Sequence, residues 1–78
     1  MRKVIVEVDV KHTREGEKLP LSVFWEDGRK YCIDRILDMR RAASLKVGGQ
    51  GMRYYCRING RDTYLWLEDD KWFVEAKK

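Results

Sequence analysis

The residues best suited to chemistry in this sequence are arginines interleaved with aromatic residues in its middle part. Residues 28–61 hold nine basic and two acidic side chains, a net charge of +7 within a chain of net charge +4. Guanidinium groups make forked contacts with phosphate and stack on rings. Exposed sheet faces of this kind bind single-stranded nucleic acid by stacking its bases and neutralising its backbone. The candidate nucleic-acid-binding residues are therefore Arg29, Arg35, Arg40, Arg41, Lys46, Arg53, Tyr55, Arg57, Tyr64 and Trp66.

A tight hairpin at Asn59-Gly60 is expected to position many of these side chains. Asn-Gly is typical of a two-residue type I′ turn, because both turn residues need positive φ. The predicted register pairs Ile58 with Arg61 and continues to Met52 opposite Leu67. One face then forms the core, with Met52, Tyr54, Cys56, Ile58, Leu65 and Leu67. The other face carries Arg53, Tyr55, Arg57, Tyr64 and Trp66.

The same face has a purely structural interpretation. Arg53 over Trp66 would be a cation–π pair, Arg57 with Asp62 an ion pair, and Tyr55 with Tyr64 a cross-strand ring pair. Closure of the sheet or a helix packed across it would also cover Tyr64 and Trp66. A protein-interaction domain that uses exposed aromatic residues or an edge strand is the alternative function. We expect a monomer or weak dimer in either case.

Catalysis, metals and cofactors are not expected. Cys32 and Cys56 fall within predicted strands, where buried thiols are usually inert. The single His12 and the two distant cysteines match no zinc spacing. The glycine-rich segment 46–51 lacks both the P-loop and the dinucleotide-binding patterns. The hypothesis is therefore a non-enzymatic binding module, with a thiol-dependent enzyme as a third interpretation that rapid labelling of a cysteine would support.

Six strands can be predicted from alternation and turn residues. Valine at every even position from Val4 to Val10 predicts a half-buried strand over residues 3–10. Asp27-Gly28 predicts a two-residue turn that pairs Val23 with Cys32. Further strands are expected at residues 21–26, 29–36, 52–58, 61–67 and 72–76, with a turn at 68–71. Residues 38–51 are expected to form a short helical turn followed by a flexible glycine-rich loop.

These elements predict a mainly β fold. We expect a small antiparallel five- or six-stranded barrel or strongly twisted sheet with one short helix. The third strand has apolar residues on both faces, so it is either central or bent around a closed barrel. An open sheet with the 38–45 helix packed across it is the alternative.

Length and composition place the chain in a broad class. The 78 residues, 44% of them hydrophobic, suit a single domain over residues 1–78. No stretch approaches the ~18 consecutive apolar residues of a membrane span. Glu7 and Asp9 interrupt the N-terminal segment, so no signal peptide is expected. The expected location is the cytoplasm, with reduced thiols.

The segment from Pro20 to Asp38 resembles a small bacterial family of β-rich proteins of unassigned function. The resemblance rests on a Trp-x-x-Gly-Arg-x-Tyr pattern, here Trp25, Gly28, Arg29 and Tyr31, followed by alternating apolar residues. The segments at Arg53-Tyr54-Tyr55 and Trp72-Phe73 resemble the same family, so the likeness covers most of residues 20–75. It implies a bacterial, cytosolic, β-rich domain, and it carries over no catalytic or binding residues.

Overall fold

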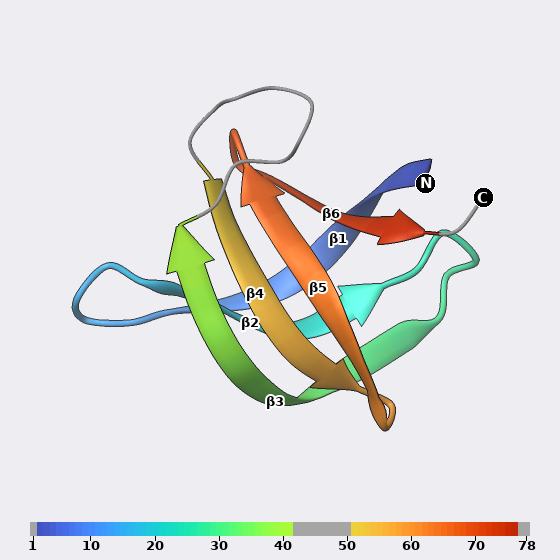
Figure 1. Ribbon diagram of the computed structural model, residues 1–78, viewed down its shortest axis with the longest axis horizontal. Coiled ribbons are helices and arrows are strands. Elements are labelled where there is room, and N and C mark those ends of the chain that lie inside the picture. Colours follow the sequence, from blue (N-terminus) through green and yellow to red (C-terminus); the bar gives the residue numbers. More distant parts are fainter. Residues whose placement is uncertain (1, 42–50, 77–78) are drawn as a thin grey trace.

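The chain forms six antiparallel strands that close into a barrel in sequence order, with the last strand paired to the first (Figure 1). The computed structural model describes residues 2–41 and 51–76. Within these ranges there is no helix. The predicted small antiparallel barrel is confirmed, in its six-stranded form. Its strands are β1 (Arg2–His12), β2 (Lys18–Phe24), β3 (Lys30–Arg41), β4 (Gly51–Ile58), β5 (Arg61–Glu68) and β6 (Lys71–Ala76).

The barrel interior is a small apolar core to which the strands contribute alternate residues. Val4 and Val6 of β1 are buried there, and Val8 and Val10 pack against the same core. The predicted inward face of β4 and β5 is confirmed, because every residue assigned to it belongs to the core or packs on it. The hydroxyl of the buried Tyr54 donates a hydrogen bond to the Lys18 carbonyl oxygen at 2.6 Å. Burial of each large apolar side chain stabilises the folded protein by about 1.5–3 kcal/mol.

The β4–β5 hairpin has the predicted turn and register. Asn59 and Gly60 have φ values of 51° and 76°, as a type I′ turn requires. The paired residues run from Ile58 with Arg61 to Gly51 with Glu68. The Gly60 amide also donates to Asp34 Oδ2 at 3.2 Å, which ties the turn to β3. This hairpin fixes which side chains of β4 and β5 face outward together.

The β2–β3 turn differs from the prediction by one residue. Gly28 has positive φ (87°) and Asp27 does not. The Trp25 amide donates to the Arg29 carbonyl at 2.8 Å, closing a three-residue loop. Asp27 Oδ1 instead accepts from the Arg29 amide at 2.9 Å, which favours a type I turn followed by a left-handed glycine.

This register changes the faces of β3, since a shift of one residue exchanges inside and outside. Val23 pairs with Tyr31 rather than with Cys32 as predicted. Tyr31 is therefore half-buried on the side of Val23, whereas the Cys32 thiol is exposed.

Strand β3 continues to Arg41, so the helical turn predicted from residue 38 is wrong as far as residue 41. The pairing with β4 shifts between Ile33 and Arg35 and again between Ile36 and Asp38, which makes Asp34 and Leu37 extra residues at two bulges. The rest of the predicted helical turn and the loop up to residue 50 lie outside the described residues. Gly51, which was assigned to that loop, begins β4.

The two bulges explain the apolar residues on both faces of β3. They allow Ile33, Ile36 and Met39, three residues apart, all to pack on the core. Of the two alternatives for this strand, bending around a closed barrel is the one observed.

The predicted turn between the last two strands is confirmed at Asp69-Asp70. Both residues have positive φ, 50° and 62°, and Glu68 pairs with Lys71 across the turn. Two non-glycine residues are thus held in the left-handed region, which costs energy even though aspartate tolerates it better than most residues.

We expect Asp70→Gly to stabilise the protein by about 0.5–1 kcal/mol, because glycine adopts positive φ without a steric penalty. The exposed ion pair between Lys18 and Asp70 is lost, but such pairs contribute little. Urea denaturation followed by circular dichroism measures the change. Asp70→Asn is the control, since it removes the same charge and keeps the side chain. Equal effects of the two variants would contradict the backbone explanation.

Candidate nucleic-acid interface

Strands β3, β4 and β5 lie side by side in one wall of the barrel (Figure 1), and their register places their outward side chains on one surface. Directly opposite residues share a face, so the register arranges them in three rows across the strands. The rows are Arg35–Arg57–Asp62, Asp38–Tyr55–Tyr64 and Arg40–Arg53–Trp66. We call these nine residues the arginine face. It brings together seven of the ten predicted site residues.

Two arginine pairs face each other across β3 and β4. Arg35 lies opposite Arg57, and Arg40 lies opposite Arg53. Like charges directly opposite in a sheet repel and lower stability. Arg35 is exposed and has no ion-pair partner among the described residues. The arginine face therefore holds four cations in two unfavourable pairs.

Two aspartates neutralise part of this charge. Asp62 Oδ1 accepts from Arg57 Nε at 2.9 Å, and Asp38 Oδ2 accepts from Arg40 Nε at 2.6 Å. These hydrogen bonds hold the pKa of each aspartate below its usual value, so both are ionised at neutral pH. With four arginines and two aspartates, the face keeps a net charge of +2.

The aromatic residues of the middle row contact one another. Tyr55 and Tyr64 have ring centroids 4.9 Å apart with planes inclined at 36°. The guanidinium carbon of Arg53 lies 4.7 Å from the Tyr64 centroid. The Tyr55 hydroxyl donates to Asp62 Oδ2 at 3.3 Å, and the charge of Asp62 raises the pKa of Tyr55. The Tyr55–Tyr64 and Arg57–Asp62 contacts of the structural interpretation are therefore present, while Tyr64 stays 44% exposed.

Trp66 lies on the outward side of β5 but offers little surface for stacking. It is 8% exposed and parallel to Phe73 of β6, with centroids 6.0 Å apart. The guanidinium carbon of Arg53 lies 6.0 Å from its centroid. The indole Nε1 is buried and has no hydrogen-bond acceptor among the described residues. Trp66 therefore packs beneath the other side chains of the arginine face, and Tyr64 is the exposed ring of that face.

The remaining predicted site residues do not join this surface. Arg29 follows the β2–β3 turn and lies 3.6 Å from the Asp27 carboxylate. Arg41 lies opposite Met52 and lines a cavity of about 390 Å³ at the barrel end near Lys18. Lys46 lies outside the described residues. The bulges of β3 thus direct Arg35 and Arg40, but not Arg41, onto the arginine face.

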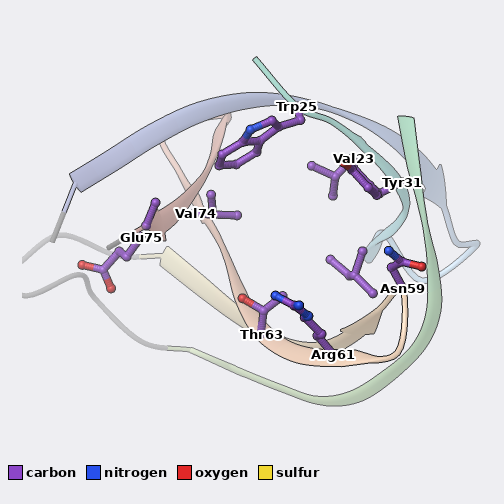
Figure 2. A pocket seen from close by; sticks show the side chains of 10 residues that line it. Val23, Trp25, Tyr31, Asn59, Arg61, Thr63, Val74 and Glu75 are labelled. Carbon is purple, nitrogen blue, oxygen red and sulfur yellow. The ribbon is translucent and has the colours of Figure 1, made fainter. Parts of the chain in front are cut away.

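A second cavity, of about 420 Å³, lies where β5 and β6 diverge (Figure 2). These strands pair only between residues 66–68 and 71–73, and the barrel opens beyond that point. Val23, Trp25 and Val74 line it, with Arg61 and Asn59 at its edge. Sequence reasoning missed this cavity, because its walls come from five strands and two turns and share no spacing in the chain.

The two described cysteines lie in different environments, buried for Cys56 and exposed for Cys32. Burial raises the pKa of the Cys56 thiol to about 11, the opposite of what a nucleophile needs. Cys32 is exposed. In residues 2–41 and 51–76, no cluster of histidine, cysteine, aspartate or glutamate could hold a metal ion. No helix in the same ranges is long and apolar enough to cross a bilayer.

We expect the exposed Cys32 to react with a thiol reagent no faster in the folded than in the unfolded protein, and Cys56 to react only after unfolding. Stability should also fall between pH 9 and about pH 11, because the unfolded Cys56 thiol ionises near 9.0 while the folded one keeps its proton to about 11. Urea denaturation at about pH 8 and pH 10.5 measures this loss. Cys56→Ala should reduce it, and Cys32→Ala should not. Rapid labelling of Cys56 in the native state would contradict the assignment.

A scan against family models, a search of curated proteins and a search of solved structures each found no match to this chain. The resemblance to a bacterial family of β-rich proteins therefore stays a prediction.

Proposed function

We propose that the arginine face binds single-stranded nucleic acid as a non-enzymatic module. The observation that carries the proposal is the placement of Arg35 directly opposite Arg57 and of Arg40 directly opposite Arg53. In each pair one arginine is bonded to an aspartate, so the repulsion is partly offset, and a phosphate placed between the members would attract both guanidinium groups.

The middle row supports a strand with accessible bases. Tyr64 is 44% exposed between the two arginine pairs, with Tyr55 beside it. A base can stack on such a ring only when it is not enclosed in a duplex. Arg53, which now lies over Tyr64, would move toward the phosphate as the base takes its place. Exposed rings between cationic side chains therefore favour the binding of a single strand over the binding of a double helix.

The alternative of a protein partner has less support. Each described strand pairs with two neighbours in the closed barrel, so the edge-strand version is confined to stretches where neighbours diverge, such as residues 61–65 of β5 and 74–76 of β6. The version that uses exposed aromatic residues depends on Tyr64 and makes that ring, rather than the arginines, the main contact.

Fluorescence anisotropy with labelled single-stranded DNA, single-stranded RNA and duplex DNA tests the proposal. We expect single strands of about eight nucleotides to bind at about 50 mM salt and to bind much more weakly at about 200 mM. Tyr64→Ala should weaken binding about five-fold or more. Leu21→Ala, which shortens another exposed side chain on β2, should leave it unchanged. Absence of binding at low salt would refute the proposal, and binding without salt dependence would contradict its phosphate component.

A further inference from the structure

The cavity between β5 and β6 combines an aromatic wall with polar groups at its edge. Figure 2 shows the Trp25 indole on the wall opposite Thr63 and Arg61, with Val74 beside it. The volume of about 420 Å³ is in the range of small-molecule sites. Trp25 is only half-buried, so part of its ring is accessible. Because Trp25 lines the cavity, a flat ring that enters it can contact the indole.

The polar groups at the edge suit a nitrogen heterocycle better than an aliphatic chain. Asn59 offers an amide donor and an amide acceptor, and Thr63 adds a hydroxyl. The Asn59-Gly60 turn holds its position because Gly60 bonds to Asp34 of β3. Arg61 is exposed and has no ion-pair partner among the described residues. Together they offer hydrogen bonds to a base edge and a cation to an adjoining phosphate.

The cavity also adjoins the arginine face. Arg61 directly precedes Asp62, which holds Arg57 in the first row of that face. Arg61 lies opposite Ile58, whose side chain lines the cavity. A strand crossing from Arg40 toward Arg57 therefore reaches the edge of the cavity at the β4–β5 turn, where Arg61 is the next cation.

We propose that this cavity binds one unstacked nucleobase at the end of a nucleic-acid strand that lies on the arginine face. The base stacks on Trp25, its polar edge meets Asn59 and Thr63, and its phosphate meets Arg61. The proposal rests on the proposed function and names the part of the ligand that enters the barrel.

The test combines two variants of the protein with strands that lack one terminal base. Asn59→Gly removes the amide and keeps a residue that tolerates positive φ, and Arg61→Ala removes an exposed cation. The probes are an intact strand of about eight nucleotides and matched strands lacking only the 5′-terminal or only the 3′-terminal base. Affinity is measured by anisotropy, and the indole N–H resonances of the protein are followed by NMR.

We expect loss of one terminal base to weaken binding roughly five-fold or more and to shift the Trp25 resonance back toward its free position. Asn59→Gly should weaken binding of the intact strand and have almost no effect on the strand that lacks that base. If no strand binds the wild-type protein, the proposed function fails. A second outcome separates the two proposals. If strands bind, but removal of neither terminal base changes the Trp25 resonance or the effect of Asn59→Gly on affinity, then the cavity does not bind a base. The proposed function stands in that case.

Discussion

Replacement of Phe73 by alanine is expected to lower the free energy of unfolding by about 3–5 kcal/mol. Phe73 is 1% exposed although it lies on the outward side of β6, where it stacks on Trp66 and carries the Lys3 ammonium 4.1 Å from its ring centroid. A domain of this length has a total stability of about 4–12 kcal/mol. A single ring outside the barrel thus accounts for a large share of the stability.

Thermal and urea denaturation followed by circular dichroism measure this loss, which should lower the melting temperature by at least about 12 °C. Ile5→Ala is the matched control, because Ile5 pairs with Phe73 across β1 and β6 but is 56% exposed. It should cost less than about 1 kcal/mol. A similarly small cost for Phe73→Ala would show that the outer ring pair is not a second core.

The second large effect is expected on binding. Arg35→Ala combined with Arg57→Ala removes one complete like-charged pair from the arginine face. For a single strand, the slope of log affinity against log salt should fall by about 1.4, and affinity at low salt should fall by a factor of ten or more. Anisotropy titrations over a series of salt concentrations give both quantities.

The control for this double variant is Lys11→Ala with Arg14→Ala. It removes the same charge from exposed residues at the end of β1 and in the following turn. If the two double variants lose the same affinity, net charge alone attracts the strand. That result would contradict specific binding at the arginine face.

Asp62→Asn separates binding from self-pairing on this face. Asp62 accepts hydrogen bonds from Arg57 and Tyr55, so a purely structural network should only lose stability when its charge is removed. If phosphate competes with Asp62 for Arg57, the same change should strengthen binding several-fold. Unchanged or weakened binding by a folded Asp62→Asn variant would favour the structural interpretation.

Sequence reasoning was reliable where one local rule determined the outcome. Asn59-Gly60 specifies a turn, the turn specifies a register, and the register places Arg53, Tyr55 and Arg57 on one side. Asp27-Gly28 looked equivalent, but Asp27 bonds through its side chain to the Arg29 amide and adopts an ordinary φ, so the loop gained one residue. The Asp27 turn differs from the Asn59 turn in its side-chain hydrogen bond and in its backbone bond from Trp25 to Arg29, and the residue types reveal neither.

The structure of β3 depended on the whole barrel. Leu37, Arg41 and Leu45, four residues apart in the sequence, are compatible with a helical turn over residues 38–45, and only the pairing with β4 shows that β3 continues to Arg41 with bulges at Asp34 and Leu37. The burial of Trp66 likewise depends on its neighbour Phe73 across β5 and β6. The barrel-end cavity could not be predicted, because strand divergence is a property of the closed sheet.

The two bulges of β3 each add one residue without changing the order of partners that follow. Deleting Leu37 would leave Ile36 opposite Cys56 and Asp38 opposite Tyr55 in regular alternation, so the later side chains of the strand would keep their sides. The strand would lose one of the two local bends with which it curves around the closed barrel. A chain with one residue fewer at this position would therefore keep the same outward residues on a straighter β3.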